Sequence, residues 1–116
     1  MLVANNIKKG KVVPFQLDEK DENCSNGSGK VLDVFGYIVK IKTDSGDEPI
    51  FRVIKGDKLK KNAPFQYDER DKKCEKGSGE IISIAGSVVQ IQPNSGSGSE
   101  TLHRFIVGNR LQIKKQ

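Results

Sequence analysis

Two cysteines and two acidic clusters are the residues of this sequence whose type and spacing could support chemistry. Cys24 and Cys74 lie at the same position of two similar loops, so they could form a disulfide or a regulated pair of thiols. Stable disulfides belong to oxidising compartments, and the first residues do not resemble a signal peptide, so we expect two reduced, half-buried thiols. Two cysteines and the distant His103 fall short of the four closely spaced ligands of a zinc site.

The acidic residues cluster in the same two loops, at 18–22 and 68–71. Carboxylates three residues apart could contribute to a calcium site, which needs six to eight oxygen ligands. Lys20 and Arg70 lie inside the two clusters, which favours solvated loops with local pairing over a metal site. The first residue of each cluster, Asp18 or Asp68, is also a candidate side-chain cap for a turn.

The remaining candidates for chemistry are two Gly-Ser-Gly segments and one histidine. A phosphate-binding loop needs a following helix or a Lys-Ser/Thr pair, and neither follows 27–29 or 77–79, so we expect these glycines to turn the chain into a strand. His103 has Phe51 as its counterpart, which indicates a packing position rather than a catalytic base. No Ser–His–Asp or Cys–His arrangement occurs in both copies, so we expect no enzyme, cofactor or metal.

These candidates occur in pairs because the chain is an internal repeat. A shift of fifty residues aligns Pro14-Phe15-Gln16 with Pro64-Phe65-Gln66 and gives 15 identities over positions 14–46. After a two-residue insertion in the second copy, Arg52, Ile54, Gly56 and Leu59 align with Arg104, Ile106, Gly108 and Leu111. The protein is therefore two copies of a unit of about fifty residues.

Each copy has the pattern of a small β-protein. Strands are predicted over 11–17, 31–35, 38–41, 50–54 and 58–60, with tight turns at 35–37 and 56–57 and a long polar first loop. No window shows helical periodicity. The fold expected is all-β, with one SH3-like barrel over 1–60 and a second over 61–116, Phe15 and Phe65 being core residues. The alternative is one pseudo-symmetric double barrel that shares strands.

The second strand pair carries a glycine and valine pattern in both copies. The segments are Gly29-Lys-Val-Leu-Asp-Val-Phe-Gly-Tyr-Ile-Val-Lys-Ile and Gly79-Glu-Ile-Ile-Ser-Ile-Ala-Gly-Ser-Val-Val-Gln-Ile. Each resembles the "G-x-V-x-x-x-x-G-x-V-x-I" hairpin of KOW-type and Tudor-like modules. Such barrels bind RNA, DNA, ribosomes, polymerases or protein tails, so the resemblance implies a binding module and no catalysis.

Composition and charge permit a polyanionic partner. Hydrophobic residues are 34% of the chain and charged residues 30%, which is typical of a polar globular protein. No apolar run approaches the roughly twenty residues of a membrane-spanning helix. The net charge of +5 divides into +2 over residues 1–10, 0 over 11–60 and +3 over 61–116. This mild excess is compatible with nucleic acid but does not require it.

Basic and aromatic residues at the ends of the expected strands are the candidate binding residues. The basic ones recur at the junctions of the copies: Lys8, Lys9 and Lys11; Lys58, Lys60 and Lys61; Arg110, Lys114 and Lys115. They could form one stripe along the phosphates of a nucleic acid, or simply a solvated surface. Phe35 and Tyr37 flank a turn in the first copy only, so they could stack on a base, grip a peptide or contact the other copy.

The leading hypothesis is a cytoplasmic, non-enzymatic adaptor that binds nucleic acid or a nucleoprotein assembly. The alternative is a protein-interaction or structural module of an envelope or phage assembly, in which exposed strand edges pair with another protein or with a second copy. The acidic loops and the neutral first copy favour this alternative.

Overall fold

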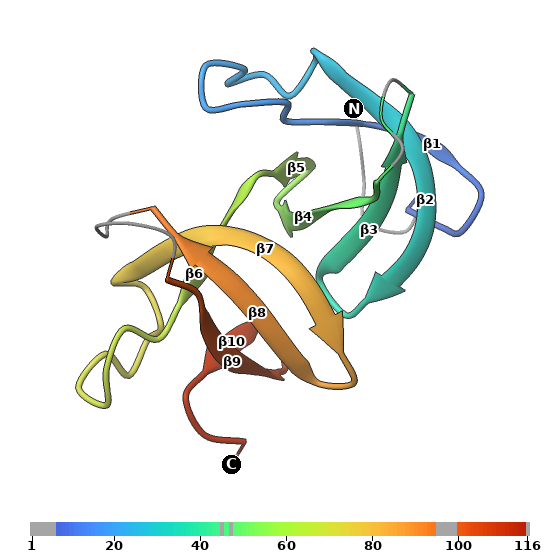
Figure 1. Ribbon diagram of the computed structural model, residues 1–116. Helices are drawn as coiled ribbons and strands as arrows, with labels where there is room; N and C mark the ends of the chain where they lie inside the picture. The colour runs from blue at the N-terminus through green and yellow to red at the C-terminus, as the bar shows by residue number, and fades with distance from the viewer. Residues whose placement is uncertain (1–6, 45, 47, 95–99, 116) are drawn as a thin grey trace. The chain divides into compact units, whose positions relative to one another are not determined.

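The computed structural model describes residues 7–44, 46, 48–94 and 100–115, in which the regular secondary structure is entirely β-strand (Figure 1). The chain divides into two compact units, Met1–Lys61 (unit 1) and Asn62–Gln116 (unit 2). Unit 1 contains β1 (Val12–Phe15), β2 (Gly27–Phe35), β3 (Ile38–Thr43), β4 (Ile50–Lys55) and β5 (Lys58–Lys60). Unit 2 contains β6 (Asn62–Phe65), β7 (Gly77–Ala85), β8 (Val88–Pro93), β9 (Leu102–Val107) and β10 (Arg110–Gln112). Among the described residues, no helix could span a membrane.

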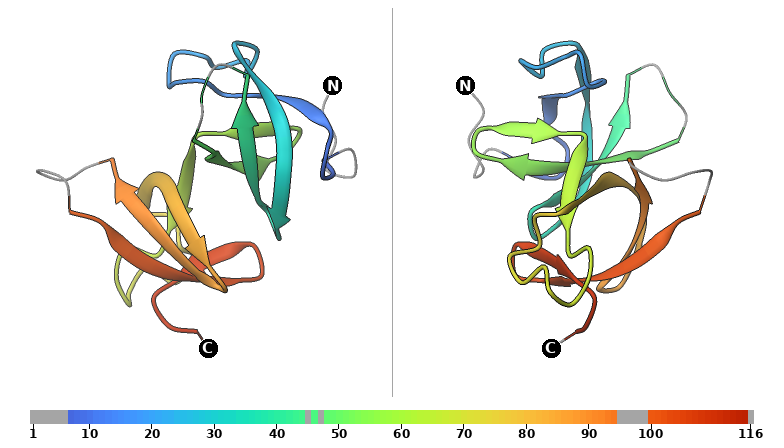
Figure 2. Two further views of the ribbon diagram at one scale, coloured as in Figure 1. Left: turned by 45° about the vertical axis from the view of Figure 1, so that its right-hand side comes forward. Right: turned by 90° about the vertical axis from the view of Figure 1, so that its left-hand side faces the viewer.

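Each unit is one antiparallel meander, in which every strand pairs with its neighbours in sequence. The first and last strands of the meander meet, because the Gln16 amide donates a hydrogen bond of 2.9 Å to the Leu59 carbonyl oxygen. In unit 2 the Gln66 amide donates to the Leu111 carbonyl oxygen, also at 2.9 Å. Each sheet therefore curls into a small, nearly closed barrel (Figure 2). The expected all-β fold of two tandem barrels is confirmed, and each sheet takes its strands from one copy.

Tight turns and bulges produce this curvature. Gly36 and Gly56 occupy the first position of two-residue turns with φ of +65° and +62°, which suits a type II′ hairpin and is a conformation that other residues rarely adopt. The pairing of β2 with β3 shifts between Val31 and Asp33, which adds one residue to β2. Such a bulge bends a strand and increases its twist. Unit 2 repeats the same turns and the same shift.

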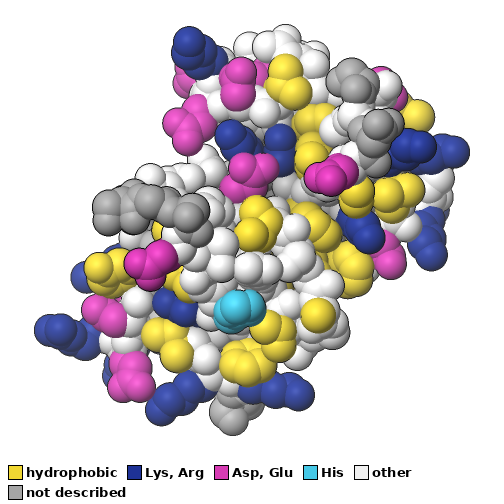
Figure 3. All heavy atoms as spheres, viewed as in Figure 1, with side chains coloured by type: hydrophobic (Ala, Val, Ile, Leu, Met, Phe, Trp, Pro, Cys, Tyr) yellow, Lys and Arg dark blue, Asp and Glu magenta, His cyan; other side chains and the backbone are white. Residues whose placement is uncertain are grey.

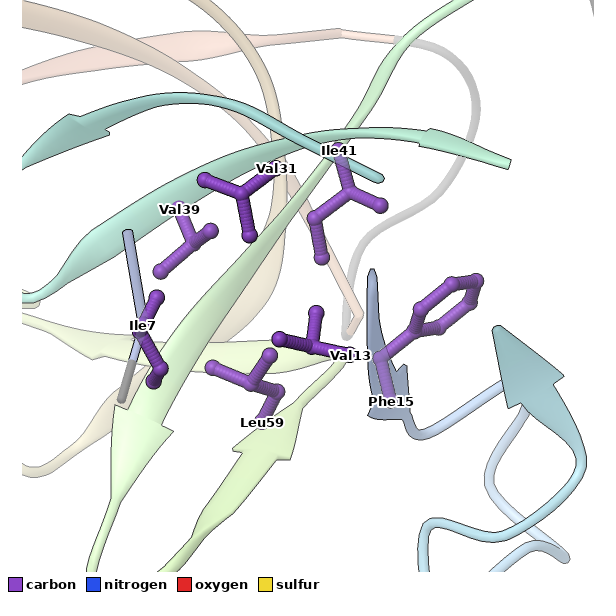
Figure 4. Close-up of a cluster of buried hydrophobic side chains, with 7 residues drawn as sticks. All are labelled: Ile7, Val13, Phe15, Val31, Val39, Ile41 and Leu59. Carbon is purple, nitrogen blue, oxygen red and sulfur yellow. The ribbon is translucent and has the colours of Figure 1, made fainter. Parts of the chain in front are cut away.

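The core of unit 1 lies inside the curled sheet (Figure 4). Val39 and Ile41 alternate along β3 and point inward with the other members of the cluster, which are Ile7, Val13, Phe15, Val31 and Leu59. Unit 2 buries the equivalent side chains of Ala63, Phe65, Ile81, Val89, Ile91 and Leu111. The side chains of Phe15 and Phe65 are 1% and 2% exposed, so their prediction as core residues is confirmed.

An arginine packs against the core phenylalanine of each unit, and it is buried in unit 1 (Arg52) and half-buried in unit 2 (Arg104). The Arg52 guanidinium lies 5.2 Å from the centre of the Phe15 ring, a cation–π geometry. Its Nε donates to the Gln16 carbonyl oxygen at 2.7 Å and its Nη1 donates to its neighbour Phe51 at 2.9 Å. Arg104 makes the same contacts in unit 2, with Phe65, Gln66 and His103. The arginine therefore joins the fourth strand to the residues that follow the first strand.

The Gly-Ser-Gly segments have a different role from the one expected. They do not turn the chain into a strand, because 27–29 and 77–79 already lie within β2 and β7. A Cβ atom at Gly27 would collide with the ring of Phe15, and one at Gly29 would collide with the Lys42 carbonyl oxygen. Glycine is needed here because the aromatic ring and the neighbouring strand occupy the space of a side chain.

The expectation that His103 is a packing position is wrong. His103 is exposed in β9, opposite Gln90 of β8, although its counterpart Phe51 is buried. The Gln90 side chain donates to the Thr101 hydroxyl at 2.8 Å and accepts from the Ser83 hydroxyl at 3.0 Å. The second copy thus has a polar side chain where the first has Phe51, beside the polar Ser83 and Gln90, which correspond to Asp33 and Lys40.

Replacement of Gly77 by alanine should destabilise unit 2 by overpacking against Phe65, at a cost of about 1–3 kcal/mol. The matched control is Ser78→Ala, because Ser78 is the next residue and is exposed on the opposite face. The control should change the free energy of unfolding by less than about 0.5 kcal/mol. Urea denaturation followed by circular dichroism measures both, and equal midpoints for the two variants would contradict the packing role.

Candidate functional site

A buried carboxylate organises the long first loop of each unit. Asp21 is 4% exposed, and its oxygens accept hydrogen bonds from the amides of Leu17 at 3.1 Å, Ser25 at 3.0 Å and Asn26 at 2.9 Å. Asp18 accepts from the Lys20 and Asp21 amides, as expected for a turn cap. In unit 2 the Asp71 carboxylate accepts from the amides of Tyr67, Glu75 and Lys76. The loops are therefore built around carboxylates that the backbone itself satisfies.

The cysteines provide the backbone conformation that this loop requires. Cys24 and Cys74 both have φ of +55°, in the left-handed region. The reversal at Cys24 directs the next two amides back toward the Asp21 carboxylate. Both thiols are free, and they are 5% and 3% exposed. Burial raises the pKa of each thiol, which keeps it protonated and unreactive near neutral pH.

The same hydrogen bonds determine how the two carboxyl groups titrate. Burial alone would raise the pKa of Asp21, but the amide hydrogen bonds from Ser25, Asn26 and Leu17 outweigh it and bring the pKa below its ordinary value of 3.8. The pKa of Asp71 is lowered by the equivalent amides. Both groups are thus held as carboxylates, with their oxygens directed at protein amides.

The first group of predicted basic residues forms a rigid turn. The Lys11 amide donates to the Lys8 carbonyl oxygen at 3.0 Å, and Gly10 has φ of +88°, as in a type II turn. Two further hydrogen bonds attach this turn to β2: the Gly10 amide donates to Val31 at 2.9 Å, and the Val31 amide donates to Lys11 at 2.8 Å. Lys8, Lys9 and Lys11 are exposed. Their backbone is therefore fixed against the second strand.

Two lysines that the sequence analysis did not single out lie beside this turn. Lys30 of β2 and Lys42 of β3 are directly opposite each other in the sheet. Their neighbours Val31 and Ile41 are core residues, so both lysines point outward, and both are exposed. Within the described part of the chain, neither makes an ion pair with a carboxylate. We call Lys8, Lys9, Lys11, Lys30 and Lys42 the strand surface; dark blue side chains gather over β1 and β2 in Figure 3.

The second group of predicted basic residues lies elsewhere on unit 1. The Nζ atoms of Lys58 and Lys60 are each 3.5 Å from the Glu22 carbonyl oxygen, so both cover the acidic first loop. Lys58 also lines a hollow of about 520 Å³, together with Pro14, Asn23, Cys24, Ser25, Asp57 and Leu59. Lys61 is half-buried, and its amide donates to the Gln16 side chain at 2.9 Å.

The remaining predicted residues lie in unit 2 or at the β2–β3 turn of unit 1. Arg110 donates to the Lys72 carbonyl oxygen at 3.5 Å, and Lys114 makes an exposed ion pair of 3.5 Å with Glu69. Lys115 is exposed. Phe35 and Tyr37 are half-buried at the β2–β3 turn, at the opposite end of this hairpin from Lys30. Within unit 1, the turn that carries Lys8, Lys9 and Lys11 is hydrogen-bonded to Val31, the residue next to Lys30.

The buried carboxylates predict a loss of stability in acid. Because folding lowers the pKa of Asp21 and Asp71, their contribution is complete well above pH 3.8 and is lost as the pH falls through the lower folded-state value. The midpoint of thermal unfolding, followed by circular dichroism from pH 6 to pH 2, should therefore decline at the acidic end. An Asp21→Asn, Asp71→Asn double variant should melt lower at pH 6 and vary less with pH. Parallel curves for the two proteins would contradict this role.

Comparison with known proteins gives this chain no relative. No protein-family model, curated protein or solved structure matches it.

Proposed function

We propose that this protein is a non-enzymatic binding module that contacts the phosphate backbone of nucleic acid through the strand surface of unit 1. The observation that carries the proposal is the direct opposition of Lys30 and Lys42 across β2 and β3. Like charges in this position destabilise a sheet, by up to about 1 kcal/mol relative to neutral pairs. A bound phosphate would neutralise the pair and remove this cost.

The internal repeat shows that the fold does not require these lysines. The equivalent positions of unit 2 are Glu80 and Gln92, which pair in the same register. The framework of strands, turns and core is the same in both units. The fold of the unit does not explain why unit 1 has this pair of lysines, which supports a role for them in binding.

The adjoining turn adds preorganised positive charge. Lys8, Lys9 and Lys11 stand on a backbone held to β2 by hydrogen bonds at Gly10 and Val31. A ligand that contacts them does not have to order this segment, so less conformational entropy is lost on binding. Contacts of this kind fix a protein on a nucleic-acid backbone without reading its sequence.

The architecture supports a binding role of this kind. Two small, nearly closed barrels, each with the glycine and valine hairpin described above, resemble KOW-type and Tudor-like modules, and these bind nucleic acids and proteins. Phe35 is five residues from Lys30 along β2, or about 16 Å at the usual rise per residue. A nucleic-acid strand long enough to reach both Lys30 and Phe35 would combine phosphate contacts at one end of the hairpin with base stacking at the other.

A Lys30→Glu, Lys42→Gln variant tests the proposal, because it gives unit 1 the residues that unit 2 already accommodates. Fluorescence anisotropy of labelled single-stranded and duplex DNA and RNA should show salt-dependent binding by the natural protein. For duplex DNA, the slope of log K against log salt concentration should decrease by about 1.8 in the variant, at about 0.9 for each of two lost phosphate contacts.

The matched control is Lys58→Glu, Lys60→Gln, which makes the same two kinds of substitution on β5. It should leave the slope nearly unchanged, since these lysines lie over the acidic loop at Glu22. If both variants weaken binding equally, the effect is one of net charge and the strand surface has no special role. If the natural protein binds no nucleic acid at low salt, the proposed function is wrong.

A further inference from the structure

We propose that unit 2 carries a second, separate phosphate-binding surface on the loop between β6 and β7. Its members are Arg70, Lys72, Lys73 and Lys76 of the loop and the neighbouring Arg110 of β10; we call them the loop surface, and all are exposed. This proposal takes from the proposed function only the chemistry of the ligand, a nucleic-acid phosphate. The location of the surface is argued independently, from the differences between the two copies of the loop.

The interior of the loop is the same in both copies. The capping aspartate, the buried aspartate and the left-handed cysteine of unit 1 recur as Asp68, Asp71 and Cys74. Asp71 accepts three amide hydrogen bonds, as Asp21 does. Because the backbone framework is retained, differences at the exposed positions are not required by the fold.

At those exposed positions the charge has changed. Lys20, Glu22, Asn23, Ser25 and Asn26 of unit 1 correspond to Arg70, Lys72, Lys73, Glu75 and Lys76 of unit 2. The five positions sum to zero in unit 1, with one lysine and one glutamate, and to +3 in unit 2, with four cations and one glutamate. The second copy has therefore gained three positive charges on an unchanged backbone.

The geometry makes these charges available to a ligand. Arg70, Asp71, Lys72, Lys73, Glu75 and Lys76 line a hollow of about 300 Å³. The Asp71 carboxylate is 3% exposed with its oxygens directed at backbone amides, and among the loop cations Lys76 is close enough to help lower the pKa of this carboxyl group. Arg110 lies next to the hollow, with Nη1 3.5 Å from the Lys72 carbonyl oxygen. Figure 3 shows dark blue side chains, with acidic ones between them, at this end of unit 2.

The two surfaces are not copies of each other. Unit 1 has lysines at Lys30 and Lys42 of its sheet, where unit 2 has Glu80 and Gln92. Unit 2 has four cations on its first loop, where unit 1 has Lys20 and Glu22, with Lys58 and Lys60 of β5 reaching the loop from outside it. The two copies therefore differ in where their basic side chains are concentrated. Two linked contact surfaces increase affinity for one long polyanion beyond that of either surface alone.

A Lys73→Asn, Lys76→Asn variant tests this surface, because Asn23 and Asn26 occupy these positions in unit 1. Anisotropy with a labelled DNA duplex should show a slope of log K against log salt smaller by about 1.8, and an affinity at 0.1 M salt lower by at least roughly tenfold. The matched control is Lys55→Ala, Lys115→Ala, which removes two exposed lysines outside both surfaces.

A titration of the natural protein with the DNA duplex, monitored by amide NMR, locates the contact directly. The resonances of residues 70–76 should shift.

The outcomes separate this inference from the proposed function. If Lys73→Asn, Lys76→Asn binds like the control and residues 70–76 do not shift, the loop surface is wrong, whatever the strand-surface variant shows. If Lys30→Glu, Lys42→Gln binds normally while the loop variant loses affinity, the proposed function at unit 1 is wrong and the loop surface stands. Loss of affinity in both variants, with a combined variant weaker than either, supports both surfaces.

Discussion

The structure of each unit depends on one buried carboxylate, Asp21 or Asp71. A charged group removed from water must be compensated by hydrogen bonds, and here three backbone amides of its own loop supply them. This requirement places the cysteine in the left-handed region and holds the polar loop against the barrel. The loop leads into β2 at Gly27, where the absence of a side chain leaves room for the Phe15 ring. In unit 2 the exposed cations Arg70, Lys72, Lys73 and Lys76 stand on the loop that Asp71 organises.

Duplication lets one half of the chain serve as a reference for the other. Positions that are the same in both copies include Asp21 and Asp71 or Arg52 and Arg104, which hydrogen bonding and packing explain. Positions that differ lie largely on the surface and carry the net charge. This internal comparison distinguishes residues that maintain the fold from residues that are available for binding.

Sequence reasoning predicted the repeat, the strands, the glycine turns and the core phenylalanines, because these depend on local pattern and on the pairing of copies. It did not predict that Gly27 and Gly29 lie within a strand, since the reason is a ring and a carbonyl from distant segments. It also did not identify Lys30 and Lys42 as a pair. Their opposition depends on the register of β2 and β3, which the bulge near Val31 shifts by one residue. The exposure of the His103 side chain likewise depends on what packs against β9. The aligned residue Phe51 is buried and therefore does not predict it.

The meander has a consequence for how the protein folds during synthesis. Every ladder joins strands that are adjacent in sequence, so most pairing in a unit requires only short loops to close, and low contact order favours rapid folding. The amide of Lys61 is among the last groups of unit 1 to find its partner, the Gln16 side chain. Unit 1 can therefore complete its barrel before β7 has left the ribosome, so that similar strands of the two copies do not compete for partners.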